Sequence, residues 1–403
     1  MKQGVECCSI AMGPESHQAL RRFPPASGIR TIFDRTKRME AEGIEVLHLE
    51  VGKPAWKMPK GMELRVQDAI ADGFVHYVQN RGLLELRESV SDQIERQTGR
   101  RFDPDTEIII TIGASEAVCM TALTLLDHRD EIIVPMPAWP HYDAVAQMAG
   151  ARVVPLPLRS ENGFQIDTQQ LEDAITPATR LVVVNSPSNP TGGVQTADTL
   201  REVAALSDKH GFYVLCDDVY RDFVYEGTHE SIASYMGDSN RLIYINSFSK
   251  SYAMTGWRLG YVAADAELSD ALNRIHQYTA VCGVSFAQKA AAQLLSDDGL
   301  TQYLQEMKTA FMKRRKLWSD LVEECDALEA TTPEGAFYTF PRVEFRSMTG
   351  REFCSFVLDE HAMAMVPGDV FGPSYEQHVR ISYGGDLQTQ ARAVERMGNI
   401  LNG

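Results

Sequence analysis

Short runs of β-branched and aliphatic residues alternate with amphipathic stretches through the middle of the chain, and this alternation limits the possible folds most. The stretches Ser115–Leu126 and Ala197–His210 repeat their apolar residues with a helical period. Several apolar runs are almost uninterrupted, which is typical of strands covered by helices on both faces. The pattern predicts an α/β domain over residues 59–298, with helices around a mainly parallel sheet of seven strands. The predicted strands are Ile108–Thr111, Ile132–Pro135, Arg152–Pro155, Leu181–Val184, Tyr213–Cys216, Leu242–Ile245 and Gly260–Ala263.

The two ends of the chain have a different pattern. Residues 28–42 predict a charged amphipathic helix, and residues 45–49 predict a strand. A long helix is expected at residues 303–325. It is followed by shorter strands at 336–341 and 379–383 and by helices at 351–360 and 389–401. We therefore expect a flexible arm at residues 1–27 and a smaller α+β domain that combines residues 28–58 with residues 299–403.

Composition and charge exclude several classes of protein. The chain has 403 residues, with 39 Lys and Arg against 55 Asp and Glu, and its formal net charge is −16 at pH 7. This charge disfavours binding to nucleic acids and to anionic membrane surfaces. Seven scattered cysteines without a C-x-x-C pair are typical of reduced thiols. No segment has the apolar length of a membrane span, and the first residues lack the apolar core of a signal peptide, so we expect a cytoplasmic protein.

The signature sequences of several enzyme classes are absent. H-E-x-x-H, G-x-x-x-x-G-K-[ST], G-x-G-x-x-G and G-x-S-x-G do not occur in the chain. The ten histidines are not clustered with the spacing of metal ligands, so no metal site is expected.

Polar segments follow four of the predicted strands at the points where those strands end. They span residues 112–116, 185–192, 217–220 and 246–252. Ligands of open α/β sheets bind beyond the carboxyl ends of the strands. If the strands are parallel neighbours, these four segments meet at one edge of the sheet.

The residues of these segments, together with Trp139 and Arg258, suit a phosphorylated aromatic aldehyde that can be protonated. A helix that begins at residues 113–115 offers free N–H groups to a phosphate, and Arg258 adds a charged fork. Asp217 can hold a ring nitrogen protonated. Lys250 can form a Schiff base, because an amine near other cations loses pKa and becomes nucleophilic. Trp139 can stack on a ring face.

Each of these features also has a purely structural explanation. A Gly-Ala-Ser start is usually a helix cap, Asn-Pro-Thr-Gly is usually a turn, and a single lysine is usually solvated. Asp217 could cap the segment that follows it, and Trp139 could belong to the core. The functional interpretation therefore requires that the carboxyl ends of the four strands meet at one edge of the sheet.

The segment Ser247-Phe-Ser-Lys-Ser-Tyr-Ala-Met-Thr-Gly-Trp-Arg-Leu-Gly-Tyr261 resembles the Schiff-base signature of the class I and II aminotransferases, which are fold type I enzymes that use pyridoxal 5′-phosphate. The resemblance implies that Lys250 forms the aldimine with this cofactor and moves the substrate proton. It implies that Asp217 contacts the pyridine nitrogen and Tyr220 the phenolic oxygen. The other residues that it implies for cofactor binding are Trp139, Asn189, Ser247, Ser249, Arg258 and, toward a neighbouring subunit, Tyr77. The helix start adds Gly113, Ala114 and Ser115 to the expected cofactor-binding residues.

The resemblance extends from about Gly28 to the carboxyl terminus. The segment Leu49–Pro54, with Gly52, and the segment Val379–Tyr383, with Arg380, resemble the parts that face the substrate, together with Asn189. Arg380 is implied to bind the α-carboxylate. The implied reaction moves an amino group from an L-amino acid to a 2-oxo acid through a pyridoxamine phosphate form of the cofactor. The implied assembly is a homodimer with shared active sites.

Some alternatives remain open at this point. Asp218 stands where the family mostly has Glu, which changes little in the expected site. Lys53 and Ala55 replace acidic residues that are common beside the substrate, so the resemblance does not define the substrate. A second cation for an acidic substrate has three candidates: Arg30, Lys53 and Arg81. A PLP-dependent β- or γ-lyase or a cyclising synthase shares the same scaffold. A regulatory module that binds the cofactor without turnover usually carries a DNA-binding domain, for which the residues before the match leave little room.

Overall fold

The computed structural model of the protein describes residue 24 and residues 26–402. The flexible arm predicted for residues 1–27 therefore lies almost wholly outside the described residues. Within these residues, no helix is both long and apolar enough to cross a membrane.

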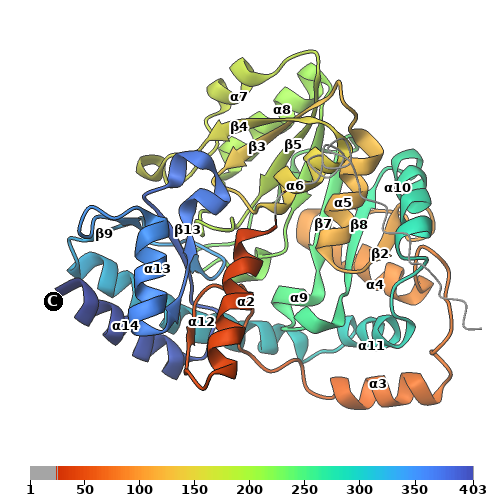
Figure 1. Ribbon diagram of the computed structural model, residues 1–403. Helices are drawn as coiled ribbons and strands as arrows, with labels where there is room; N and C mark the ends of the chain where they lie inside the picture. Colours follow the sequence, from red (N-terminus) through yellow and green to blue (C-terminus); the bar gives the residue numbers. More distant parts are fainter. Residues whose placement is uncertain (1–23, 25, 403) are drawn as a thin grey trace, which may run out of the picture.

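A seven-stranded sheet forms the centre of the molecule, in the order β2-β8-β7-β6-β5-β3-β4 (Figure 1). The pairs from β7 to β4 are parallel, and β8 is antiparallel to both of its neighbours. The predicted α/β fold with a mainly parallel sheet is confirmed. The strands are β2 (Ile108–Thr111), β3 (Glu131–Met136), β4 (Arg152–Pro157), β5 (Thr179–Asn185), β6 (Tyr213–Asp217), β7 (Leu242–Ser247) and β8 (Gly260–Ala264).

The position of β8 differs from a simple series of parallel neighbours. It lies between β2 and β7, so β2 is not adjacent to any parallel strand. Two successive antiparallel pairings nevertheless leave β2 parallel to β7. The carboxyl ends of β2, β5, β6 and β7 therefore meet at the same edge of the sheet.

Helices cover both faces of the sheet because the side chains of each strand alternate between two apolar clusters. Ile109 packs in a cluster with residues of α5, α6 and α10. Ile108 and Ile110 pack on the opposite face with residues of α4, α7, α8 and α11. The helices are α2 (Gly28–Ala41), α3 (Met62–Ala71), α4 (Leu84–Thr98), α5 (Ala114–Leu125), α6 (His141–Ala149), α7 (Thr168–Ala174), α8 (Ala197–His210), α9 (Phe248–Ser251), α10 (Ala266–Thr279), α11 (Ser285–Leu295), α12 (Leu300–Glu324), α13 (Gly350–His361) and α14 (Leu387–Asn402).

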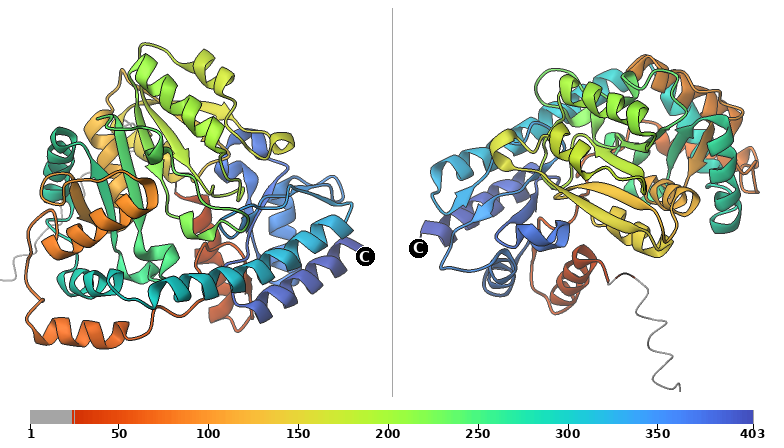
Figure 2. Two further views of the ribbon diagram at one scale, coloured as in Figure 1. Left: turned by 180° about the vertical axis from the view of Figure 1, so that it is seen from behind. Right: turned by 90° about the horizontal axis from the view of Figure 1, so that it is seen from above.

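The two ends of the chain meet beside this sheet. β1 (Leu47–His48) pairs in parallel with β12 (Met363–Ala364). β14 (Val379–Ser382) lies between β10 (Tyr338–Thr339) and β13 (Val366–Pro367), antiparallel to both. A third small sheet joins β9 (Leu328–Glu329) to β11 (Arg342–Val343). Figure 2 shows α14 running alongside the long helix α12, and the two helices share one apolar cluster.

The strand predicted at residues 336–341 is shorter in the structure. Ala336 has a φ of 53°, which an extended strand does not allow, and regular pairing is limited to β10. Tyr220 and Phe223, which follow β6, belong to the same apolar cluster as the residues of β1, β10 and β14. Through this cluster, the residues that follow β6 pack against the segments that come from the two chain ends.

Candidate active site

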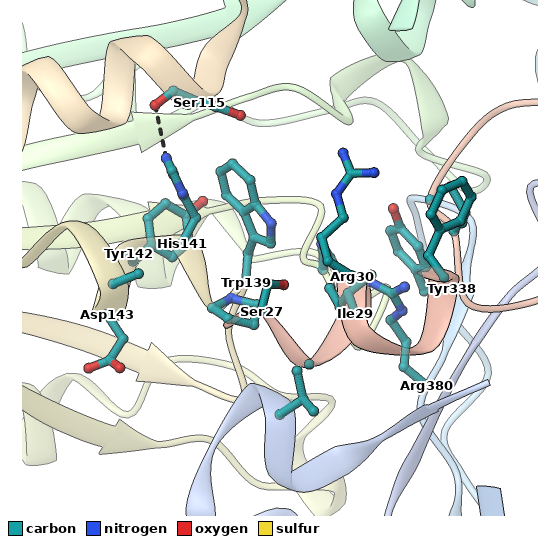
Figure 3. Close-up of a pocket in the computed structure, with 18 of the residues that line it drawn as sticks. Ser27, Ile29, Arg30, Ser115, Trp139, His141, Tyr142, Asp143, Tyr338 and Arg380 are labelled. Carbon is teal, nitrogen blue, oxygen red and sulfur yellow. Dashed lines mark hydrogen bonds between the residues drawn. The ribbon is translucent and has the colours of Figure 1, made fainter. Parts of the chain in front are cut away.

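A cavity of about 920 Å³ lies at the edge where the carboxyl ends of the strands meet, and α2 and β14 close its other side (Figure 3). The structure brings almost all of the predicted site residues to this cavity, although they come from eight separate segments. Those that line it are Gly52, Ala114, Ser115, Trp139, Asn189, Asp217, Tyr220, Ser247, Ser249, Lys250, Arg258 and Arg380.

Lys250 lies on α9, directly after β7. The turn is fixed by Ser247, whose hydroxyl accepts a hydrogen bond from the Ser249 N–H (3.3 Å). The Nζ atom of Lys250 donates to the carbonyl oxygen of Gly52 (2.7 Å). Burial and the positive charges of Arg380 and Arg258 lower the pKa of Lys250 to about 8. The amine is therefore much closer to its neutral, nucleophilic form than an exposed lysine is.

Asp217 is the last residue of β6, and its carboxylate is fully buried. Its Oδ2 atom accepts a hydrogen bond from the Tyr142 hydroxyl (2.6 Å), and its Oδ1 atom accepts one from the Val219 N–H (3.3 Å). Burial raises the pKa of Asp217 to about 6. A positively charged group in the cavity would lower the pKa of Asp217 again, because an opposite charge favours the ionised carboxylate.

The amino-terminal end of α5 forms a cradle for an anion. Gly113 precedes the helix with a φ of 77°, and a Cβ at this position would lie 2.7 Å from Nη2 of Arg258. Arg258 donates to the carbonyl oxygens of Ile112 (3.1 Å) and Thr255 (3.2 Å). Gly113 is not among the residues that line the cavity, but it lets the guanidinium approach the helix end. Free N–H groups and a cation at one point favour a phosphate.

Arg380 comes from β14 and is only 1 % exposed. Its Nη1 atom donates to Oδ1 of Asn189 (3.1 Å), and its Nη2 atom donates to the carbonyl oxygen of Glu50. Burial lowers the pKa of Arg380, but a guanidinium stays charged at any physiological pH. The arrangement presents a buried, oriented cation to the cavity, which suits a carboxylate.

Two tyrosines of the site were missed by the sequence analysis as functional residues. Tyr142 hydrogen-bonds Asp217, and the hydroxyl of Tyr338 lies 2.7 Å from the hydroxyl of Tyr220. These pairs are 75 and 118 residues apart in the sequence. For Tyr142 the available signal was its position three residues after Trp139, at the start of α6. For Tyr338 it was the segment Gly335-Ala-Phe-Tyr338, which also fits the family resemblance.

The three candidate cations for an acidic substrate lie in different places. Arg30 is on α2 and lines the cavity, and Figure 3 shows its side chain on the same side of the cavity as Tyr338 and Arg380. Lys53 is exposed and does not line the cavity. Arg81 donates to the Ser269 hydroxyl (2.7 Å) instead. Among the described residues, only Arg30 of these three reaches the site.

Tyr77 lies outside the cavity of its own chain, with 85 % of its surface exposed. Its segment is tied to the segment after α10, because the Asn80 side chain donates to the Val281 carbonyl (2.6 Å). Tyr278, on α10, is 91 % exposed.

The residues of the cavity fit pyridoxal 5′-phosphate. A cradle of N–H groups and Arg258 suits the phosphate, and Lys250 suits the aldehyde. Asp217 suits the ring nitrogen, because burial raises the pKa of this carboxyl and a protonated nitrogen beside it would stabilise the ionised carboxylate. Trp139, next to Tyr142 with ring centroids 5.6 Å apart, offers an aromatic face.

Comparisons with known proteins show the family of the chain. Residues 45–397 match the family model of the aminotransferases of class I and II. The chain is 38 % identical to aromatic-amino-acid aminotransferase 2 of Thermococcus litoralis, over 93 % of this chain and 95 % of that protein. It is 37 % identical to an aspartate aminotransferase of Pyrococcus abyssi, again over 93 % of this chain and 95 % of the relative.

Solved structures of similar proteins have the same fold. The aromatic aminotransferase of Pyrococcus horikoshii superposes with a TM-score of 0.85 at 36 % identity, covering 92 % of this chain and 98 % of that one. The aspartate aminotransferase of Thermus thermophilus with maleate superposes with a TM-score of 0.90 at 29 % identity, covering 95 % and 99 %.

Proposed function

The chain belongs to the family of class I and II aminotransferases and is a transferase of amino groups, and we propose that it works with pyridoxal 5′-phosphate bound in the cavity described above. The observation that carries this proposal is the meeting of a buried lysine, a buried aspartate and a buried arginine in one cavity, from α9, β6 and β14. Lys250, Asp217 and Arg380 contribute a nucleophile, a negative charge and a carboxylate clamp.

The roles of these residues follow from their chemistry. Arg380 binds the α-carboxylate of the amino acid and so orients its Cα–H bond toward Lys250. The neutral Nζ atom of Lys250 would take the proton from Cα and return it to C4′, the former aldehyde carbon of the cofactor. Asp217 would keep the ring nitrogen of the bound cofactor protonated, and Tyr220 and Asn189 would hold its phenolic oxygen. The cofactor, when bound, supplies the aldehyde and the ring that withdraws electrons from Cα.

Covalent capture tests the assignment of Lys250. The holoenzyme is reduced with borohydride and digested, and the modified peptide is identified. We expect the modification at Lys250, and its loss together with all turnover in Lys250→Ala. Lys289→Ala is the matched control, because Lys289 pairs with Glu85 outside the cavity (2.8 Å). Capture at another lysine would show that the site is misassigned.

A single-substrate experiment separates transfer from elimination. An aminotransferase mixed with an amino acid alone should release one equivalent of oxo acid per site and then stop. Turnover should resume when a second oxo acid is added. A lyase would continue without an acceptor and would release ammonia or a side-chain group. Continued turnover with one substrate would contradict the proposal.

We propose that Arg30 contacts the side chain of the substrate, so that dicarboxylic substrates are accepted. Two observations support this role: Arg30 lines the cavity, and among the described residues it forms no ion pair. Arg30→Gln should lower kcat/KM for aspartate at least tenfold and for phenylalanine less than threefold. Arg35→Gln, on the same helix but paired with Asp359, is the control. Equal losses for both substrates would contradict the role.

We propose a homodimer in which Tyr77 reaches the phosphate of the neighbouring site. The exposed apolar side chains beside Tyr77 support this surface; they are Val75, Tyr278, Val281 and Val284. We further propose that residues 28–58 and 299–403 form one small domain beside a large domain of residues 59–298. The pairing of β1 with β12 supports this division.

A further inference from the structure

Tyr338 occupies a central position among the functional residues of the cavity. It lies on β10, which pairs with β14, the strand that carries Arg380. Its side chain is 1 % exposed and lines the cavity. It contacts residues from three other segments of the site: Tyr220, Arg380 and Gly52.

The hydroxyls of Tyr338 and Tyr220 share one hydrogen bond of 2.7 Å, and either can donate. Burial raises the pKa of both groups, so each keeps its proton near neutral pH. Only one of the two protons can lie between the oxygens. When Tyr338 donates, the proton of Tyr220 is free to point into the cavity. When the Tyr220 oxygen accepts a hydrogen bond from Tyr338, its own O–H becomes a stronger donor, because hydrogen bonds in a chain polarise one another.

The ring of Tyr338 faces the guanidinium of Arg380. The Cζ atom of Arg380 lies 4.8 Å from the ring centroid, and a second ring, Phe371, lies 5.0 Å away. The hydrogen bonds of Arg380 to Asn189 and to the Glu50 carbonyl leave little freedom for its plane. The aromatic contact fixes the guanidinium from the side that its hydrogen bonds do not cover.

The same hydroxyl explains the glycine at position 52. A Cβ at this position would overlap the Tyr338 oxygen, so only glycine allows the backbone to pass this close. The carbonyl of Gly52 accepts the hydrogen bond of Lys250 Nζ (2.7 Å). Tyr338 therefore contacts the backbone segment against which the amine of Lys250 rests.

We propose that Tyr338 is a positioning residue of the amino-transfer reaction: its hydroxyl directs the proton of Tyr220 into the cavity, and its ring holds the plane of Arg380. This inference rests on the proposed function of the cavity. Tyr338 acts on the reaction through these two neighbours, and each neighbour can be tested separately.

The hydroxyl is tested with Tyr338→Phe, which keeps the ring. We expect the Kd of the apoenzyme for pyridoxal 5′-phosphate to rise at least fivefold. The pH at which the absorbance of the bound cofactor titrates should move upward by at least half a unit, because the donor to its phenolic oxygen is weaker. In a Tyr220→Phe background, Tyr338→Phe should add less than a twofold change. An additive loss in the double variant would overturn the role of the hydroxyl.

The ring is tested with Tyr338→Leu and a carboxylate that lacks an amino group, 3-phenylpropionate. Its Kd for the holoenzyme should rise at least fivefold in Tyr338→Leu and less than twofold in Tyr338→Phe. Tyr375→Phe controls for the loss of a buried tyrosine hydroxyl, because that hydroxyl bonds the carbonyls of Met136 and Leu158 outside the cavity. Equal Kd values in Tyr338→Leu and wild type would overturn the role of the ring.

The wild-type arm separates this inference from the proposed function. If wild type binds the cofactor at Lys250 and Tyr338→Phe behaves like wild type in cofactor binding and in the pH titration, only the role of the Tyr338 hydroxyl is wrong. If Tyr338→Leu also behaves like wild type toward 3-phenylpropionate, the role of the ring is wrong as well. If wild type does not bind pyridoxal 5′-phosphate, the proposed function and this inference both fail. Circular dichroism and thermal unfolding of each variant confirm that the comparison is between folded proteins.

Discussion

At the scale of single residues, the charge state of Lys250 depends on its surroundings in the fold. Burial, Arg380 and Arg258 lower its pKa to about 8, and Asp217 acts in the opposite direction. At pH 7 roughly one amine in ten is then neutral, compared with about one in 2,500 for an exposed lysine of pKa about 10.4. The fold thus prepares the amine to attack an aldehyde without a separate base.

The lowered pKa of Lys250 predicts how the rate of cofactor capture depends on pH. Only the neutral amine attacks, and a lowered pKa moves the neutral form to lower pH. The rate at which the apoenzyme captures pyridoxal 5′-phosphate should therefore rise about tenfold per pH unit below the pKa of about 8 and level off above it. Stopped-flow absorbance measures this rate. A midpoint near 10, the value of a solvated lysine, would contradict the assignment.

Asp217→Asn should slow α-proton removal by at least a hundredfold while the fold is retained. An amide carries no charge to hold the ring nitrogen protonated, and the developing negative charge on the substrate loses its stabilisation. Single-turnover kinetics with one amino acid measure the effect. Asp143→Asn is the control, since Asp143 also lines the cavity but hydrogen-bonds Gln147 (2.7 Å). A loss of less than fivefold in Asp217→Asn would remove Asp217 from this role.

At the scale of elements, the start of α5 depends on the close approach of β8. A Cβ on Gly260 would lie 2.8 Å from the backbone carbon of Gly113 and 2.9 Å from the nitrogen of Ala114. Neither neighbour is a flexible side-chain end. The antiparallel insertion of β8 thus sets the position of the helix end that we propose to bind the phosphate.

Gly260→Ala should therefore weaken cofactor binding and lower stability together. The overlap forces β8 and α5 apart, which we expect to cost about 1–3 kcal/mol of unfolding free energy. The Kd for pyridoxal 5′-phosphate should rise at least tenfold. Gly256→Ala is the matched control, because a Cβ there has no neighbour within 4 Å. Urea unfolding and cofactor titration measure both effects; similar values for the two variants would contradict the argument.

At the scale of the whole molecule, the location of Tyr77 bears on assembly. Tyr77 is exposed and lies far enough from its own cavity that it lines no part of it. A tyrosine that serves the site only from a second chain requires a dimer with two-fold symmetry, in which each chain supplies the same residue to the other.

Mixed dimers test this requirement. Lys250→Ala and Tyr77→Ala proteins should each be strongly impaired alone. After unfolding and refolding together, random pairing gives one intact site in half of the dimers, so activity should return to about a quarter of wild type. Light scattering checks the dimer mass. An activity equal to the average of the two parents would show that Tyr77 does not serve a neighbouring site.

Much of the fold was predictable because its signals are local. The apolar runs of β2 and the amphipathic pattern of α8 have the same bounds in sequence and structure. Lys250 and Asp217 follow apolar runs that have to be buried strands, and ligands of α/β sheets bind where such strands end. The class of chemistry was therefore already contained in the order of strands and polar segments.

Only the tertiary structure decided which distant residues meet. The antiparallel insertion of β8, the presence of Arg30 rather than Lys53 or Arg81 in the cavity lining, and the pairing of Tyr142 with Asp217 and of Tyr338 with Tyr220 do not follow from any local pattern. The physical reason is that a hydrogen bond or a close packing contact acts over a few ångströms, whereas its partners lie up to hundreds of residues apart in the chain. Periodicity reports which face of an element is buried, but the contacts of that face exist only after the elements have packed.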